Sequence, residues 1–163
     1  MAVKILVYGF GNPGRGDDGL GIALADRLEE RRLPGVSCER NYQLNIEDAL
    51  EIAAYDAVLF ADASINAIEP FELRELLPAE EICFTTHAMT AHSVLALCED
   101  LYRRSPRAFM MAIRGYSWNA EEGLSGAAAD NLEKAVDFAV SLLGQSSLIE
   151  LENAASPSVK GRA

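Results

Sequence analysis

One stretch near the N-terminus decides the fold, and it runs Ile5-Leu6-Val7-Tyr8-Gly9-Phe10-Gly11-Asn12-Pro13-Gly14-Arg15-Gly16-Asp17-Asp18-Gly19-Leu20-Gly21. Its apolar start is typical of a strand buried on both faces of a sheet. The residues after Leu20 follow the apolar spacing of an amphipathic helix. Polar groups in such a strand–turn–helix connection lie at the carboxyl edge of an open α/β sheet, where ligands bind. We therefore expect the functional site at this edge.

Apolar segments and helical patterns alternate along the rest of the chain. We expect buried or half-buried strands near residues 3–8, 36–40, 56–62 and 109–113, and an edge strand or a competing short helix at 71–77. Helices are expected near residues 20–33, 46–55, 90–104 and 125–143, the third of them capped by Thr90. This alternation predicts a three-layer α/β/α sandwich with a five-stranded, mostly parallel sheet and one antiparallel edge strand.

The length of 163 residues suits one domain that buries roughly 70% of its unfolded surface. We expect a single α/β domain over residues 1–146. A Ser-, Pro- and Gly-containing flexible tail is expected over residues 147–163.

Composition narrows the partners and the compartment. The net charge of −11 argues against nucleic-acid binding, which depends on neutralising phosphates. There is no signal-peptide pattern and no apolar run of roughly 18 residues, so we expect a cytoplasmic protein without a membrane segment. Cys38, Cys83 and Cys98 are odd in number and lie among apolar residues, which is typical of buried thiols in a reducing compartment.

Three polar features follow the predicted strands. Asp17 and Asp18 begin the first helix, Asp62 ends the third strand, and His87 lies in a polar turn before a helix. If the first and third strands are neighbours, their carboxyl ends lie about 5 Å apart. Two carboxylates and an imidazole then suit a divalent metal such as nickel or zinc. The alternatives are that the aspartates cap helices and turns, and that His87 and His92 have purely structural roles.

A dinucleotide site is the main alternative for the glycine-rich turn. Residues 9–14 satisfy the G-x-G-x-x-G pattern, and Glu39 ends the second strand where a ribose-binding acid would lie. However, Asp17 and Asp18 would repel a pyrophosphate at the start of the helix, and Pro13 lacks a donor N–H. We therefore expect no nucleotide cofactor. The G-x-S-x-G pattern of serine hydrolases is also missing from the sequence.

An ordered set of motifs resembles the hydrogenase maturation proteases, which remove the C-terminal extension of the nickel-iron hydrogenase large subunit. The set comprises the Gly-Phe-Gly-Asn turn, Gly16-Asp17-Asp18-Gly19-Leu20-Gly21, Phe60-Ala61-Asp62-Ala63 and Thr86-His87-Ala88-Met89. The resemblance extends over residues 3–144. It implies an aspartic-type endopeptidase, acting as a monomer on a hydrogenase large-subunit precursor.

By this resemblance, Asp18, Asp62 and His87 are both the catalytic residues and the metal ligands. They would recognise nickel already installed in the precursor, so the metal arrives with the substrate. Gly11 and Asn12 are expected to lie against the substrate peptide, where they would leave room for it or donate to its oxyanion. A turn at Gln43 and Leu44 replaces the Asp-Gly-Gly-Thr-type turn of many members. It is more like that of the branch that serves cytoplasmic bidirectional or NAD-reducing hydrogenases.

Two other functions stay open at this point. The opening Gly-Phe-Gly-Asn-Pro-Gly is similar to that of bacterial peptidyl-tRNA hydrolases, but the later motifs of that family are missing and its substrate is polyanionic. A noncatalytic nickel chaperone would use the same three ligands.

Overall fold

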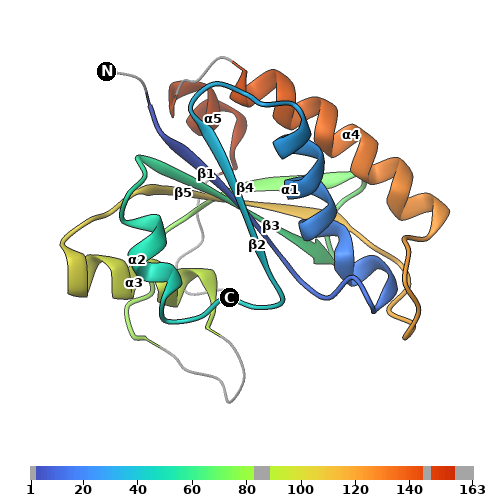
Figure 1. Ribbon diagram of the computed structural model, residues 1–163, viewed down its shortest axis with the longest axis horizontal. Helices are drawn as coiled ribbons and strands as arrows, with labels where there is room; N and C mark the ends of the chain where they lie inside the picture. Colours follow the sequence, from blue (N-terminus) through green and yellow to red (C-terminus); the bar gives the residue numbers. More distant parts are fainter. Residues whose placement is uncertain (1–2, 83–88, 145–147, 157–163) are drawn as a thin grey trace.

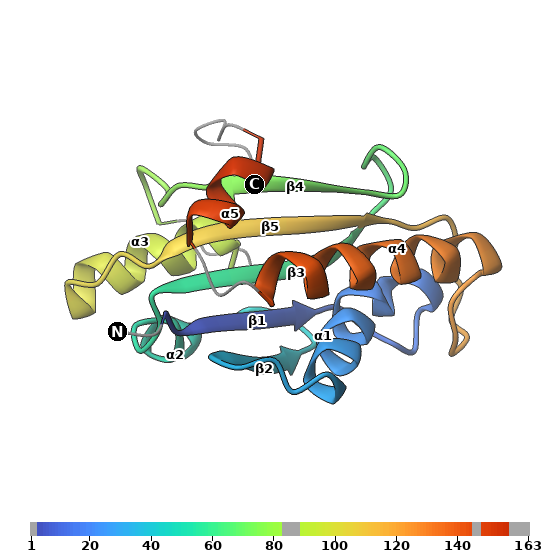
Figure 2. The same ribbon diagram turned by 90° about the horizontal axis from the view of Figure 1, so that it is seen from above.

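The computed structural model describes residues 3–82, 89–144 and 148–156. Its elements in chain order are β1 (Ile5–Phe10), the 3₁₀ helix η1 (Gly16–Gly19), α1 (Leu20–Glu30), β2 (Val36–Asn41), α2 (Asp48–Ile52), β3 (Ala57–Ser64), β4 (Phe71–Leu76), α3 (Ala91–Tyr102), β5 (Arg107–Arg114), α4 (Gly126–Leu143) and α5 (Leu148–Ala154). Helices cover both faces of one sheet (Figures 1 and 2). None of the helices in these segments has the length and apolar character that a membrane crossing requires.

The sheet has the strand order β2-β1-β3-β5-β4. Its pairs are parallel except for β4 and β5, which are antiparallel. This confirms the predicted α/β fold, and residues 71–76 form the edge strand rather than a short helix. From β1 the chain turns to one side to form β2 and later passes to the other side to form β3. Such a reversal of strand order opens a crevice at the carboxyl ends of the two central strands.

Alternate residues of each strand face opposite layers of the molecule. Val7, Leu59 and Met111 belong to the core beneath α1 and α4. Leu6 and Phe60 belong to a second core, beneath α2 and α3. In Figure 1, α2 and α3 lie at the end of the sheet opposite the arrowheads of the parallel strands β1, β2, β3 and β5. The carboxyl half of this second face is therefore left without a covering helix in the described part of the chain.

Hydroxyl side chains cap the N-termini of two helices, α3 and α4. The Thr90 side chain accepts a hydrogen bond from the Ser93 N–H at the start of α3 (3.1 Å). The Ser125 hydroxyl does the same for the Ala128 N–H at the start of α4 (3.3 Å). Each cap satisfies a backbone donor that the first helical turn leaves unpaired.

The C-terminal segment differs from the flexible tail expected over 147–163. Residues 148–154 form α5, in which Leu151 is buried in the core. Beyond it, the Glu75 N–H donates to the Ser156 carbonyl, and the Ser156 N–H donates to the Leu73 carbonyl. The open edge of β4 provides unpaired backbone groups for this contact, which the local composition does not reveal. Residues 157–163 lie outside the described chain.

The packing of α1 on the sheet depends on the absence of a side chain at Gly21. A Cβ atom there would lie 2.2 Å from the Ala61 carbonyl oxygen and 2.7 Å from that of Phe10. These are backbone atoms of β3 and β1, so the helix would have to move away. This close contact holds the start of α1 over the crevice between the two strands.

We therefore predict that Gly21→Ala lowers the free energy of unfolding by about 1–3 kcal/mol, because the added methyl group overpacks the interface between the helix and the sheet. Urea unfolding measures the change. Gly126→Ala is the matched control, since no described atom outside its neighbours and the backbone of its own helix lies within 4 Å of its added Cβ. Equal losses in the two variants would contradict this account of the packing.

Candidate active site

Asp62 lies where the crevice between β1 and β3 opens. The β1–β3 pairing ends at Gly9 and Ala61, whereas β3 continues beside β5, with Asp62 opposite Ala112. Asp62 is on the same face as Phe60, two residues earlier, and is partly buried. The alternation of β3 therefore directs this carboxylate to the uncovered half of the second face.

The surroundings of Asp62 favour its neutral form. The pKa of Asp62 is raised to about 7, because burial and the charge of Asp18 raise it by more than the hydrogen bond from the Ala63 N–H lowers it. The Ala63 hydrogen bond measures 2.9 Å. A carboxylate with a pKa near 7 can accept a proton from water at neutral pH.

Asp18 is held on the other side of the crevice by the glycine-rich turn. Its Oδ2 atom accepts a hydrogen bond from the Asn12 N–H (3.0 Å). Gly11 has a φ of +134°, and a Cβ atom there would lie 2.1 Å from the Asp18 carbonyl oxygen. The turn can close on Asp18 only because Gly11 has no side chain.

The expected donors to an oxyanion are engaged within the protein. The Gly11 N–H donates to the Asn41 carbonyl (3.2 Å), and the Asn12 N–H donates to Asp18. The Asn12 Oδ1 atom accepts from the Gly14 N–H. Among the described residues, the side-chain NH₂ of Asn12 makes no hydrogen bond, so it is the group of this pair that is left for a substrate.

Asp17, next to Asp18 in sequence, has a different role. It is fully buried and accepts hydrogen bonds from the N–H groups of Tyr116, Ser117 and Ser125 and from the Ser125 hydroxyl. Burial alone would raise the pKa of Asp17, but these hydrogen bonds outweigh it and lower the pKa below its ordinary value. Helix capping was one expectation for Asp17. Instead, its carboxylate attaches the β5–α4 connection to η1.

The turn at Gln43 and Leu44 is divided between the site and the surface. Leu44 is buried, lines the same cavity as Asp62, and accepts a hydrogen bond from the Met89 N–H through its carbonyl (3.2 Å). Gln43 is exposed and is not part of the cavity lining. His87, two residues before Met89, lies outside the described residues.

A buried polar pair fixes this turn. The Tyr8 hydroxyl donates to the Asp48 Oδ1 atom (2.8 Å), and the Asn45 N–H donates to Oδ2 (2.6 Å). Tyr8 and Asp48 are both buried. Burial, followed by the hydrogen bond to Asp48, raises the pKa of Tyr8, so the phenol keeps its proton and acts as a donor.

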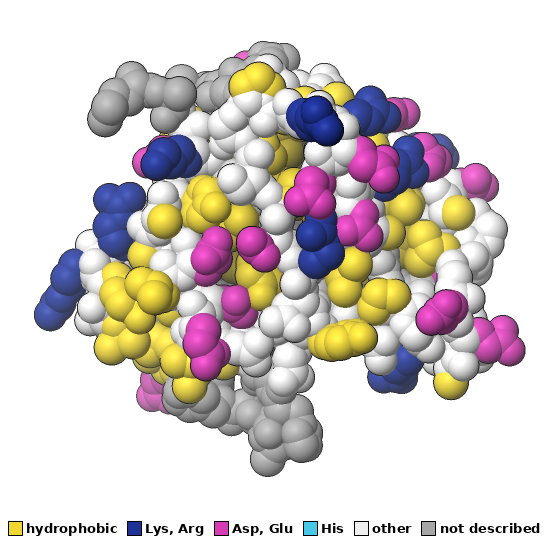
Figure 3. All heavy atoms as spheres, viewed as in Figure 1, with side chains coloured by type: hydrophobic (Ala, Val, Ile, Leu, Met, Phe, Trp, Pro, Cys, Tyr) yellow, Lys and Arg dark blue, Asp and Glu magenta, His cyan; other side chains and the backbone are white. Residues whose placement is uncertain are grey.

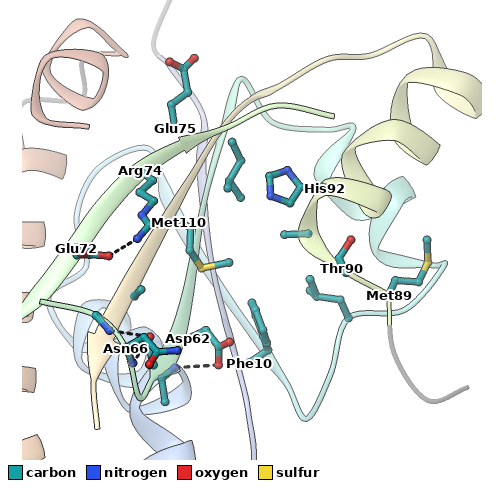
Figure 4. A pocket seen from close by; sticks show the side chains of 17 residues that line it. Phe10, Asp62, Asn66, Glu72, Arg74, Glu75, Met89, Thr90, His92 and Met110 are labelled. Atoms are coloured by element: carbon teal, nitrogen blue, oxygen red, sulfur yellow. Dashed lines mark hydrogen bonds and ion pairs between the residues drawn. The ribbon is translucent and has the colours of Figure 1, made fainter. Parts of the chain in front are cut away.

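The cavity beside Asp62 has a volume of about 500 Å³. It extends between β4 and α3, and Figure 4 shows side chains from β4, β5 and α3 around it. Nothing in the sequence indicated that Glu72, Arg74 and Met110 line a cavity, and a structural role was the expectation for His92. The alternating apolar and charged residues of 71–74 gave the edge strand but not the direction of its charged face.

Large hydrophobic side chains are exposed on both loops that border the cavity. Tyr42 and Ile46 lie on the loop that carries Leu44, and Ile65 and Ile68 lie on the loop after β3. In Figure 3, hydrophobic side chains also gather over α2 and α3, at the lower left. Exposed hydrophobic groups beside a cavity are typical of a surface that contacts another protein.

The structure brings together two members of the predicted triad. Asp18 lies close enough to Asp62 for its charge to affect the Asp62 pKa. Within residues 3–82, 89–144 and 148–156, no three His, Cys, Asp or Glu residues are grouped to hold a metal ion. A third ligand would have to come from outside these segments, where His87 lies, or from a bound molecule.

Comparisons with known proteins agree on the fold. No protein-family model matches the chain, and no curated protein matches it. Among solved structures, a [NiFe] hydrogenase maturation protease, HycI from Thermococcus kodakarensis, is 23% identical, with a TM-score of 0.69 over 86% of this chain and 92% of its own. The hydrogenase maturating endopeptidase HybD from E. coli is 22% identical, with a TM-score of 0.68 over 88% and 94%. A protein from Wolinella succinogenes, described as uncharacterized, is 26% identical, with a TM-score of 0.59 over 89% and 99%. The chain therefore has the fold of the hydrogenase maturation proteases, as the sequence resemblance implied.

We predict that Asp17→Asn lowers the free energy of unfolding at neutral pH by about 2–3 kcal/mol, because an amide group cannot accept all the hydrogen bonds that the carboxylate receives. The lowered pKa of Asp17 stabilises the folded state above about pH 4, and this contribution is lost as the pH falls through the folded-state pKa. The difference between the variant and the wild type should therefore shrink in acid. Asp18→Asn is the control, and its free energy of unfolding should stay close to that of the wild type. A larger loss in Asp18→Asn than in Asp17→Asn would mean that Asp18, not Asp17, is the structural carboxylate.

Asp62→Asn should show the opposite dependence on pH. Since the pKa of Asp62 is raised to about 7, its contribution to stability is full below about pH 4 and is lost as the pH rises to about 7. The variant should gain stability relative to the wild type across this range and then keep a constant difference. Urea unfolding of both proteins from about pH 4 to about pH 8 tests this prediction. A constant difference in the free energy of unfolding throughout would mean that the pKa of Asp62 is not shifted.

Proposed function

We propose that this protein is an aspartic-type endopeptidase that removes the C-terminal extension of a nickel-loaded hydrogenase large-subunit precursor. The observation that carries the proposal is the pair Asp18 and Asp62, which face one crevice at the carboxyl edge of a sheet with the hydrogenase maturation protease fold. The cavity beside Asp62 provides space for a substrate, and the exposed hydrophobic loops suit a protein substrate.

The carboxylate pair also suits a cation that arrives with the substrate. Two neighbouring carboxylates disfavour each other's charge, and a cation relieves this repulsion. Carboxylate oxygens and an imidazole nitrogen are ligands that nickel accepts. In this proposal, Asp18, Asp62 and His87 contact the nickel of the precursor. Because they form an incomplete ligand set, only a loaded precursor would supply the remaining ligands together with the metal.

Two routes to hydrolysis fit the site. In one, Asp62 accepts a proton from the attacking water, for which its raised pKa is suitable. In the other, the nickel of the substrate polarises the scissile carbonyl. In both routes, the Asn12 side chain is the amide donor near Asp18, because its backbone N–H is already engaged.

We also propose a cytoplasmic location. Cys38 and Cys98 are free thiols, and Cys98 is buried. Burial raises the pKa of both thiols, which keeps them protonated and unreactive. Unpaired cysteines of this kind are typical of proteins in a reducing compartment.

The test is the purified protein mixed with the nickel-loaded and the nickel-free forms of the hydrogenase large-subunit precursor from the same organism. We expect mass spectrometry to show loss of a C-terminal peptide from the loaded form only. Asp62→Asn and Asp18→Asn should each slow this cleavage by roughly 100-fold or more, and His87→Ala should stop it.

Asp56→Asn is the matched control, because this exposed carboxylate lies just before the opposite end of β3 and accepts a hydrogen bond from the Lys4 N–H. It should cleave at the wild-type rate. Stoichiometric transfer of nickel without cleavage would identify a nickel chaperone instead. Full activity in Asp62→Asn would overturn the site assignment.

A further inference from the structure

The cavity beside Asp62 continues away from the crevice as a groove between β4 and α3. We call it the β4–α3 groove and define it by Asp62 at one end, Glu72 and Arg74 on the β4 side, His92 on the α3 side, and Met110 and Phe10 between them. Figure 4 shows the His92 ring between α3 and β4. The volume of about 500 Å³ is within the usual range of ligand pockets.

His92 is an unusual residue for such a wall, because it is more than nine-tenths buried, with 8% of its surface exposed. Its Nδ1 atom lies 2.7 Å from the Leu77 carbonyl oxygen. A carbonyl can only accept, so Nδ1 carries the proton and Nε2 of the neutral ring is an acceptor. Within the described residues, Nε2 has no hydrogen-bond partner. His92 lines the groove, so Nε2 can accept a hydrogen bond from a donor bound there.

Several other polar groups of the groove are engaged within the protein. Arg74 forms an ion pair with Glu72, and Glu75 forms one with Arg107. The Thr90 hydroxyl is engaged in the cap of α3. Among the described lining residues, Asp62 and Asn66 lie at one end of the groove and the Nε2 atom of His92 lies toward the other, with the apolar side chains of Phe10 and Met110 between them. This pattern suits an extended peptide, which presents an apolar side chain and a backbone N–H at intervals along its length.

We propose that the β4–α3 groove binds the segment of the precursor next to the cleaved bond in an extended conformation, and that Nε2 of His92 accepts a hydrogen bond from a backbone N–H of that segment. This inference rests on the proposed function, because it takes the bond cleaved near Asp62 as the fixed point. His92 is then a residue that determines substrate affinity, while Asp18 and Asp62 carry the chemistry.

Two substitutions separate the two nitrogen atoms of His92. In His92→Asn, the side-chain NH₂ can still donate to the Leu77 carbonyl, but no atom reaches the position of Nε2. In His92→Gln, the longer side chain can bring an amide oxygen toward that position. Loss of one such hydrogen bond should raise KM for the nickel-loaded precursor about 3- to 10-fold in His92→Asn, with kcat unchanged. His92→Gln should recover part of this loss.

Asp100→Asn, an exposed change on the same helix, is the control and should leave both constants unchanged. A second measurement does not depend on activity. The chain contains two histidines, so a spectrum of ¹⁵N-histidine protein shows two imidazoles, and His92→Asn assigns them. Adding a synthetic peptide that spans the cleavage site should shift the Nε2 resonance of His92.

An unchanged KM in His92→Asn together with an unshifted Nε2 resonance overturns the groove assignment but leaves the endopeptidase proposal standing. A fall in kcat alone also overturns it, because the role of His92 would then lie in the chemistry. If His92→Asn unfolds, His87→Ala assigns the two imidazoles instead, and the Nε2 resonance of His92 in the wild-type protein still decides. Failure of the wild type to cleave the loaded precursor would instead overturn the proposed function, and this inference with it.

Discussion

The site depends on direct backbone contact between α1 and the two central strands. Gly21 lies against the Ala61 carbonyl of β3, and Gly11 lies against the Asp18 carbonyl. Neither position leaves room for a side chain. Together these contacts bring the turn after β1 down onto the end of β3, so that Asp18 and Asp62 face one crevice. A conventional helix–sheet separation, with side chains between the layers, would leave the two carboxylates apart.

Asp17 and Asp62 show how the environment gives two identical side chains opposite properties. Asp17 is buried among four hydrogen-bond donors, which lower its pKa. Asp62 is partly buried, receives one backbone hydrogen bond and faces the charge of Asp18, and burial together with that charge raises its pKa. The hydrogen bonds to Asp17 stabilise the fold. At Asp62, the charge of Asp18 is repulsive, and a bound cation or proton relieves this repulsion. Such opposed environments are typical of a structural and a functional carboxylate.

The groove arises from incomplete coverage of one face of the sheet. The short α2 and the position of α3 cover the amino half, while α1 and α4 cover the other face along its length (Figures 1 and 2). Apolar strands, the cap at Thr90 and the edge strand were predictable, because each depends on neighbouring residues. The packing of α5 and the position of His92 were not predictable. Leu151 is buried by the folded core, and Nδ1 of His92 bonds to Leu77, which lies 15 positions earlier.

By itself, the sequence determined the alternation of strands and helices, the glycine-rich turn at the sheet edge and the candidates Asp18 and Asp62, because strand period, helix caps and turn residues act locally. Only the tertiary structure decided which aspartate of the pair is structural, since the donors to Asp17 come from residues about one hundred positions later. The groove and the orientation of His92 were likewise decided by packing between β4 and α3. Contacts between distant segments leave no periodic pattern in either segment, so they become visible only in the folded chain.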